Sequence, residues 1–87
     1  MIRLHFTFAG AVQGVGFRYR ARHAASLYGC TGWVRNEWDD TVTMELQGEP
    51  EDIENVIRAI EAGRYVRIER MQRRQVPLED EKSFRVG

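Results

Sequence analysis

The 87-residue chain is 43% hydrophobic and 30% charged, and its 13 basic and 13 acidic side chains give a formal net charge of zero. This composition is typical of a globular protein. No apolar run approaches the ~20 residues that span a bilayer. Because basic side chains do not outnumber acidic ones, the charge balance argues against nucleic-acid or membrane partners. The single cysteine, Cys30, excludes an intrachain disulfide, and no residues show metal-ligand spacing. We expect one domain over residues 1–87, cytoplasmic and monomeric, without a metal or other cofactor.

The first half of the chain predicts a strand, a helix and a hairpin. Residues 3–9 alternate between apolar and polar side chains, as a half-buried strand does. After a glycine-rich turn, apolar residues recur at helical spacing from Phe17 to Tyr28, and Gly29 supplies a stop signal. Residues 30–36 and 41–48 then predict two strands joined by a short polar loop.

The second half predicts a helix and two further strands. Pro50 and the acidic residues after it suit the first turn of a helix that ends at Gly63. Residues 65–76 return as a fourth strand, with Val66 and Ile68 inward and its arginines on a solvated edge, and residues 83–86 form a short fifth. The order β-α-β-β-α-β plus a terminal strand predicts the α+β class and a ferredoxin-like split β-α-β fold, with an antiparallel sheet and two helices on one face.

The turn between the first strand and helix, AVQGVGFR at residues 11–18, has the composition of an anion site. Gly14 and Gly16 permit positive φ angles and a close approach of the backbone to a ligand. Consecutive amides in such a turn, followed by a helix N-terminus, favour a bound anion, and Arg18 can add a planar fork of donors. The alternative is a tight turn with a surface arginine. Neither GxxxxGK[ST] nor GxGxxG is present.

Asn36, at the end of the second predicted strand, is the second candidate site residue. In the predicted fold the first and second strands are parallel, with the third between them, so their ends share one edge about 10 Å apart. Arg18 and Asn36 can therefore approach one ligand. An amide both donates and accepts, and so can orient a water molecule; the alternative role for Asn36 is to begin the hairpin turn.

The motifs VQGVGFR at residues 12–18 and GWVRN at residues 32–36 resemble the two signatures of the acylphosphatase family, and the element order resembles it throughout. The resemblance implies a small cytoplasmic enzyme that hydrolyses acyl phosphates. It implies that Arg18 binds the phosphate, that Asn36 positions the attacking water, and that backbone amides cradle the phosphoryl oxygens. The cradle residues are Gln13, Gly14, Val15, Gly16, Phe17 and Arg18. One departure is Asp39-Asp40, where the family usually has Asp-Gly in the hairpin.

Two other functions are consistent with parts of the sequence. A binding or accessory module of the same fold would keep the anion cradle without turnover. An RNA-binding sheet would need exposed aromatic side chains on its open face, where we expect mainly polar residues such as His5, Thr43 and Glu45. We expect Trp33 and Trp38 to pack locally, Cys30 to be a buried residue without a catalytic role, and the two aspartates to form the turn.

Overall fold

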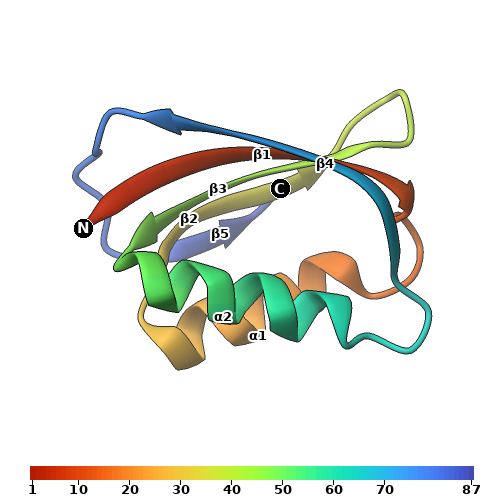
Figure 1. The fold of residues 1–87 in the computed structure, drawn as a ribbon, viewed down its shortest axis with the longest axis horizontal. Helices are drawn as coiled ribbons and strands as arrows, with labels where there is room; N and C mark the ends of the chain where they lie inside the picture. Colours follow the sequence, from red (N-terminus) through yellow and green to blue (C-terminus); the bar gives the residue numbers. More distant parts are fainter.

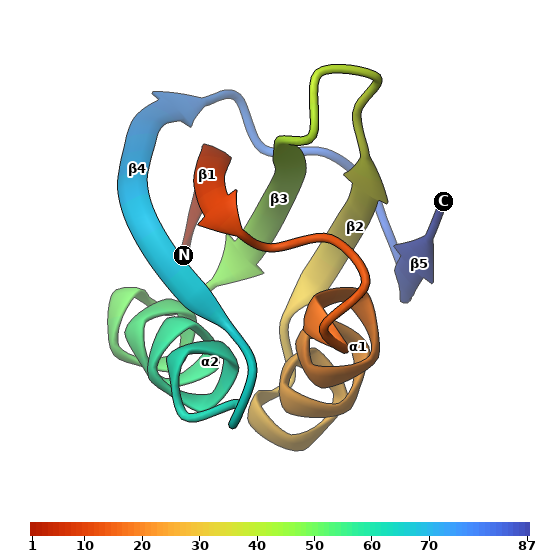
Figure 2. The ribbon, with the colours of Figure 1, turned by 90° about the vertical axis from the view of Figure 1, so that its right-hand side faces the viewer.

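A computed structural model describes residues 1–87, which form five strands and two helices. In chain order these are β1 (Ile2–Ala11), α1 (Phe17–Tyr28), β2 (Thr31–Asn36), β3 (Val42–Gly48), α2 (Pro50–Glu61), β4 (Arg67–Val76) and β5 (Phe84–Val86). The strands make one sheet in the order β4-β1-β3-β2-β5, and both helices cover the same face of it (Figure 1 and Figure 2). The predicted ferredoxin-like arrangement is confirmed. Neither helix is long and apolar enough to cross a membrane.

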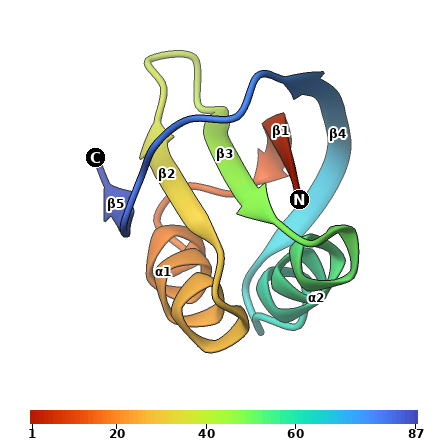
Figure 3. The same ribbon diagram turned by 90° about the vertical axis from the view of Figure 1, so that its left-hand side faces the viewer.

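The prediction of an antiparallel sheet is wrong at one edge, where β5 pairs with β2 in the parallel direction. The pairings of β1 with β3, β1 with β4 and β2 with β3 are antiparallel. Strand β4 ends at the side of the sheet where β2 begins, and residues 77–83 cross there to β5 (Figure 3). The chain therefore enters β5 running in the same direction as β2, which makes the sheet mixed.

One hydrophobic core lies between the sheet and the helices. Phe6 and Phe8 of β1 face the helices and are fully buried, as the alternation of the strand predicts. Four residues of α2 meet them from the other layer, and 17 buried hydrophobic residues form one cluster. Ile68 of β4 and Val66, which directly precedes the strand, pack against this core only in part. Strand β4 lies at the edge of the sheet, and its side chains are nearly all exposed.

Arg3 is fully buried, although the alternation of β1 places it on the face of the sheet away from the helices. Residues 77–83 cover that face there, and the carboxylates of Glu81 and Glu45 lie 2.5 Å and 2.7 Å from the Arg3 guanidinium. Gln47 accepts a further hydrogen bond from Arg3 at 3.2 Å, and its amide binds the backbone of the covering segment twice, at 2.8 Å. This polar cluster fastens residues 77–83 to the sheet and so brings β5 to its edge.

A side chain at Gly32 on β2 would meet the neighbouring strand. Gly32 has a φ of 139°, and a Cβ atom there would lie 1.9 Å from the carbonyl oxygen of Glu45. We expect Gly32→Ala to lower the free energy of unfolding by roughly 3–5 kcal/mol, from overpacking and backbone strain together. Gly29 also has a positive φ, of 69°, but open space surrounds it, so Gly29→Ala should cost about 1–2 kcal/mol. Urea unfolding compares the two, and equal losses would contradict the steric explanation.

The cluster around Arg3 should make stability depend on acidity. Burial disfavours the charged form of Glu45, but hydrogen bonds from His5 and Arg3 outweigh it and hold the pKa of Glu45 below its ordinary value. The ionised carboxylate therefore stabilises the fold above the unfolded-state pKa, and this contribution is lost as the pH falls through the folded-state pKa. We expect Arg3→Ala to cost about 3–5 kcal/mol at pH 7, because it strands buried carboxylates.

Urea unfolding from pH 7 down to pH 3 tests this account, with Arg22→Ala on the exposed face of α1 as the control. The control should stay within about 0.5 kcal/mol of the parent chain at each pH. A parent whose stability did not fall on acidification, or an Arg3 variant as stable as the control, would show that the cluster contributes nothing net.

Candidate functional site

The turn from β1 to α1 is held by two glycines in the left-handed region. Gly14 has a φ of 72° and Gly16 a φ of 83°, values that residues with a Cβ atom rarely adopt. Gly16 is the N-cap of α1, and no side chain caps the helix there. No heavy atom lies within 4 Å of the position that a Cβ would take at either glycine. The backbone of the turn is therefore bare on its outer side, where a ligand can approach it.

The backbone amides of this turn have no partner within the chain. Outside the helices and strands there are nine backbone hydrogen bonds, and none has its donor between Gln13 and Tyr19. The first turn of α1 also contains no acidic side chain. A run of unpaired N–H groups at the positive end of a helix is an anion-binding arrangement. The predicted cradle of residues 13–18 thus has the free donors that it requires.

Arg18 and Asn36 line the same pocket, although they come from different elements. The pocket has a volume of about 170 Å³, and Gly14, Gly16 and Tyr19 also contribute to its wall; we call it the Arg18 pocket. Asn36 reaches it from the end of β2, and its amide makes none of the side-chain hydrogen bonds within the protein. Arg18 donates from Nη1 to the carbonyl oxygen of Gly87 at 2.8 Å, which leaves the other donors of its fork for a ligand.

The other predicted cradle residues contribute through the backbone. Phe17 is buried, and its ring lies 4.9 Å from that of Phe8, so only its amide can face a ligand. Val15 packs partly against the core. The Gln13 side chain turns away from the Arg18 pocket and donates from Nε2 to the carbonyl oxygens of Glu37 at 2.8 Å and Thr41 at 2.9 Å.

Those two contacts tie the turn before α1 to the β2–β3 hairpin, and one of them is at Glu37, directly after Asn36. The sequence analysis assigned Gln13 to the cradle by its amide and missed this bridge. The polar side chain of Gln13 within a glycine-rich turn was a signal that this side chain has a hydrogen-bond partner. Its acceptors, however, are backbone carbonyls 24 and 28 residues further along the chain. Only the folded structure identifies them.

The hairpin accommodates the departure from the family pattern. Asp40 adopts the left-handed conformation, with a φ of 71°, at the position where the motif resemblance leads us to expect glycine. Asp39 accepts hydrogen bonds from the hydroxyl of Thr41 at 2.6 Å and from its amide at 3.2 Å, and these bonds hold the pKa of Asp39 below its ordinary value. The interpretation of the two aspartates as turn-forming residues is confirmed.

The prediction of local packing is wrong for Trp38 and confirmed for Trp33. Trp38 is 94% exposed at the tip of the hairpin and does not pack locally, because the loop projects beyond the sheet. Trp33 does pack, with its ring 5.9 Å from that of His5 and the Arg35 guanidinium 4.9 Å above it. It lies on the face of the sheet away from the helices, where the sequence analysis expected mainly polar side chains. Arg35 covers the ring, so this face still offers no open platform for stacking bases.

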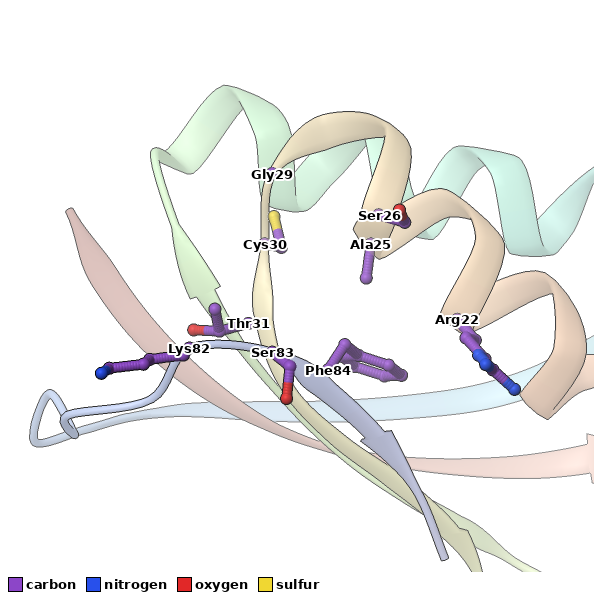
Figure 4. Close-up of a pocket in the computed structure, with 9 residues that line it drawn as sticks. All are labelled: Arg22, Ala25, Ser26, Gly29, Cys30, Thr31, Lys82, Ser83 and Phe84. Carbon is purple, nitrogen blue, oxygen red and sulfur yellow. The ribbon is translucent and has the colours of Figure 1, made fainter.

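A wider pocket between α1 and β5, of about 390 Å³, does not gather reactive groups (Figure 4). Its two cationic side chains, Arg22 and Lys82, point in different directions. Burial, and secondarily the charge of Asp52, raises the pKa of the Cys30 thiol to about 11, so this cysteine remains protonated and is a poor nucleophile. No three His, Cys, Asp or Glu side chains lie together in a way that could hold a metal ion.

Known proteins match both the sequence and the fold. Residues 4–86 match the family model Acylphosphatase. An acylphosphatase of Geobacillus thermodenitrificans is 43% identical over 88 residues, covering 99% of this chain and 94% of that protein. The crystal structure of acylphosphatase from Bacillus subtilis matches with a TM-score of 0.92 and 26% identity, covering 100% of this chain and 99% of that one. An acylphosphatase structure from Coxiella burnetii matches with a TM-score of 0.89 and 30% identity, covering 99% and 92%.

The fold and the pocket together define a ferredoxin-like α+β protein with a run of unpaired backbone amides at the β1–α1 turn. Within that class the matches extend over nearly the whole chain. The chain belongs to the acylphosphatase family.

The hydrogen bonds of Gln13 to the hairpin should contribute to the free energy of unfolding. Gln13→Ala leaves the carbonyl oxygens of Glu37 and Thr41 without their donor, and we expect a loss of about 1–3 kcal/mol in the free energy of unfolding. Gln72→Ala, on the exposed edge strand β4, is the matched control and should stay within about 0.5 kcal/mol of the parent chain. If urea unfolding gave the same value for both variants, the bridge would not hold the hairpin.

Proposed function

We propose that this member of the acylphosphatase family hydrolyses the carboxyl–phosphate anhydride of acyl phosphates to a carboxylate and inorganic phosphate. In the proposed site, the amides of residues 13–18 and the Arg18 guanidinium hold the phosphoryl group, and Asn36 positions the attacking water. The observation that carries the proposal is the run of unpaired amides from Gln13 to Tyr19, beside a pocket that Arg18 and Asn36 line together.

This small set of groups suits the chemistry of an acyl phosphate. The leaving group is a stable carboxylate, so it needs no strong general acid. Phosphoryl transfer through a loose transition state depends mainly on positioning and on stabilising charge at the phosphoryl oxygens. Fixed backbone dipoles and a guanidinium provide that stabilisation without reorganising during the reaction. Positioning by Asn36 converts the attack of water into an oriented, effectively unimolecular step.

In the proposed step the water oxygen forms a bond to phosphorus while the bond between phosphorus and the carboxyl oxygen breaks. The electron pair of that bond leaves with the carboxylate, and a phosphoryl oxygen of the substrate takes the proton of the water. The residues around the Arg18 pocket support this proton route, since they include neither a histidine nor a carboxylate. A rate that fell through an ionisation abolished by substituting His5 or Asp39 would contradict it.

We further propose that the enzyme acts without a metal ion, as a cytoplasmic monomer formed by one domain, on a small-molecule substrate. The metal-free mechanism is supported by the unpaired amides and Arg18, which provide donors for the phosphoryl oxygens. The monomer is supported by exposed large apolar side chains that are spread over several elements, and the cytoplasm by the single free cysteine. The formal charge of zero supports the absence of a nucleic-acid partner.

Hydrolysis of benzoyl phosphate in the presence of EDTA tests the proposed roles. We expect Arg18→Ala and Asn36→Ala each to lower the rate by about 10²–10³-fold, because each removes a preorganised group at the reacting phosphorus. Arg22→Ala is the matched arginine control, since Arg22 lies on the same helix outside the Arg18 pocket. Asn55→Ala on α2 is the matched asparagine control.

Circular dichroism confirms that each variant is folded before its rate is compared. A parent chain that binds inorganic phosphate but does not hydrolyse benzoyl phosphate would overturn the proposed hydrolysis and leave an anion-binding module. Turnover abolished by EDTA would overturn the metal-free mechanism, and equal rates in site and control variants would overturn the assigned roles.

A further inference from the structure

A second hollow adjoins the Arg18 pocket on the outer surface of the helix layer. Its volume is about 300 Å³, and Gly16 and Tyr19 line both hollows. We call the second one the helix groove; its other lining residues are Arg20, His23, Ala24 and Leu27 of α1 and Ala59 of α2. Because the two hollows share residues, a molecule held by its phosphate in the Arg18 pocket can extend into the helix groove along the surface.

The walls of the helix groove are aromatic and aliphatic. Tyr19, His23 and Leu27 follow one another at four-residue spacing, which places them on one side of α1 over about 12 Å. The rings of Tyr19 and His23 are nearly parallel, with an angle of 11° and 6.4 Å between centroids. Tyr19 is 75% exposed and Leu27 is 68% exposed. Single exposed apolar residues are ordinary, but these two lie in one groove that continues from the Arg18 pocket.

The floor of the groove is narrow and carries no negative charge. Ala24 and Ala59 leave space between the two helices, and no carboxylate lines the groove. The guanidinium of Arg20 lies along the helix contact, where Nη1 is 3.4 Å from the carbonyl oxygen of Ala59. A Cβ atom at Gly63 would be 2.7 Å from Nε of Arg20, so this side chain is packed on that side as well. The accessible surface is therefore mainly that of the apolar walls.

The geometry of the reaction directs the leaving group toward this groove. In an in-line displacement, the carboxylate departs on the side of phosphorus opposite the attacking water. Asn36 is the last residue of β2, in the sheet layer, whereas the helix groove lies between α1 and α2. The start of α1 lies between the end of β2 and this groove (Figure 2). In the proposed reaction, water that Asn36 positions attacks from the sheet side, so the acyl group departs from the helix side.

We propose that the helix groove is the acyl subsite of this enzyme and that it selects acyl phosphates with an aromatic or extended apolar acyl group. The inference rests on the proposed function, since it assigns the part of the substrate that the phosphate cradle does not hold. Tyr19 contacts the first part of the acyl group, and Leu27 contacts the far end of a longer chain. An acetyl group is too short to gain these contacts.

The experiment compares kcat/KM for acetyl, benzoyl and octanoyl phosphate. Tyr19→Ala should lower the benzoyl-to-acetyl ratio about tenfold, because it removes the aromatic wall that only the larger acyl group contacts. Leu27→Ala should lower the octanoyl-to-benzoyl ratio about threefold, since it lies further from the phosphate. Tyr65→Ala and Leu78→Ala are matched controls, because these residues are similarly exposed outside both hollows and should leave the ratios unchanged.

Inhibition by inorganic phosphate separates the two parts of the site. Its inhibition constant should be the same in the parent chain and in Leu27→Ala, because Leu27 lines the helix groove but not the Arg18 pocket. Equal losses for all three substrates, or equal effects of Tyr65→Ala, would overturn the acyl subsite while leaving the hydrolysis established. Faster turnover of succinyl phosphate than of octanoyl phosphate would also overturn it, because the groove would then serve an anionic tail at Arg20. A parent chain that hydrolyses none of these substrates would overturn the proposed function itself, and this inference with it.

Discussion

The site depends on the parallel course of β1 and β2 on either side of β3. Because α1 connects the two parallel strands, their C-terminal ends lie at the same edge of the sheet, and the β1–α1 turn faces the end of β2. Arg18 and Asn36, which are 18 residues apart in the chain, meet in one pocket only through this arrangement. The Gln13 side chain then fixes the hairpin to the turn through two backbone carbonyls. A change in strand order would separate every part of the site.

The two helices begin in different ways: the first turn of α2 stabilises its helix, whereas the first turn of α1 leaves its amides free. Helix α2 begins with Pro50 and two acidic residues, which suit its positive end. Helix α1 begins with Gly16 in the left-handed conformation, without a side-chain cap and without an acidic residue in its first turn. A serine or aspartate cap stabilises a helix by about 1 kcal/mol, but its oxygen would occupy the amides that an anion needs. The uncapped start of α1 is the condition for an open cradle.

Charged and polar side chains are paired within the protein on the open face of the sheet, but only in part at the edge where β1 and β2 end. On the side away from the helices, the Arg3 cluster is fully paired within the protein and holds residues 77–83 in place. At the edge where β1 and β2 end, the Arg18 fork makes one contact with Gly87 and the Asn36 amide makes none. Paired buried charges specify how the chain is arranged, whereas incompletely paired groups remain free to bind a ligand. The first set therefore supports the fold, and the second is available for chemistry.

The sequence by itself determined the elements and their order. The period of its apolar residues predicted both helices and all five strands, because burial of one face imposes a period of two on strands and 3.6 on helices. Its glycines predicted the left-handed turn before α1, and together with Arg18 they led us to expect an anion site there, because such turns and charged forks require particular residue types. The motif resemblance supplied the family.

Only the tertiary structure decided the long-range contacts that the order of the elements does not imply. The parallel pairing of β5, the burial of Arg3, the Gln13 bridge and the helix groove all depend on contacts between segments far apart in the chain. The exposure of Trp38 likewise follows from how far the hairpin extends beyond the sheet. Local patterns encode which face of an element is buried, but the partner on that face is fixed by the packing of the whole chain.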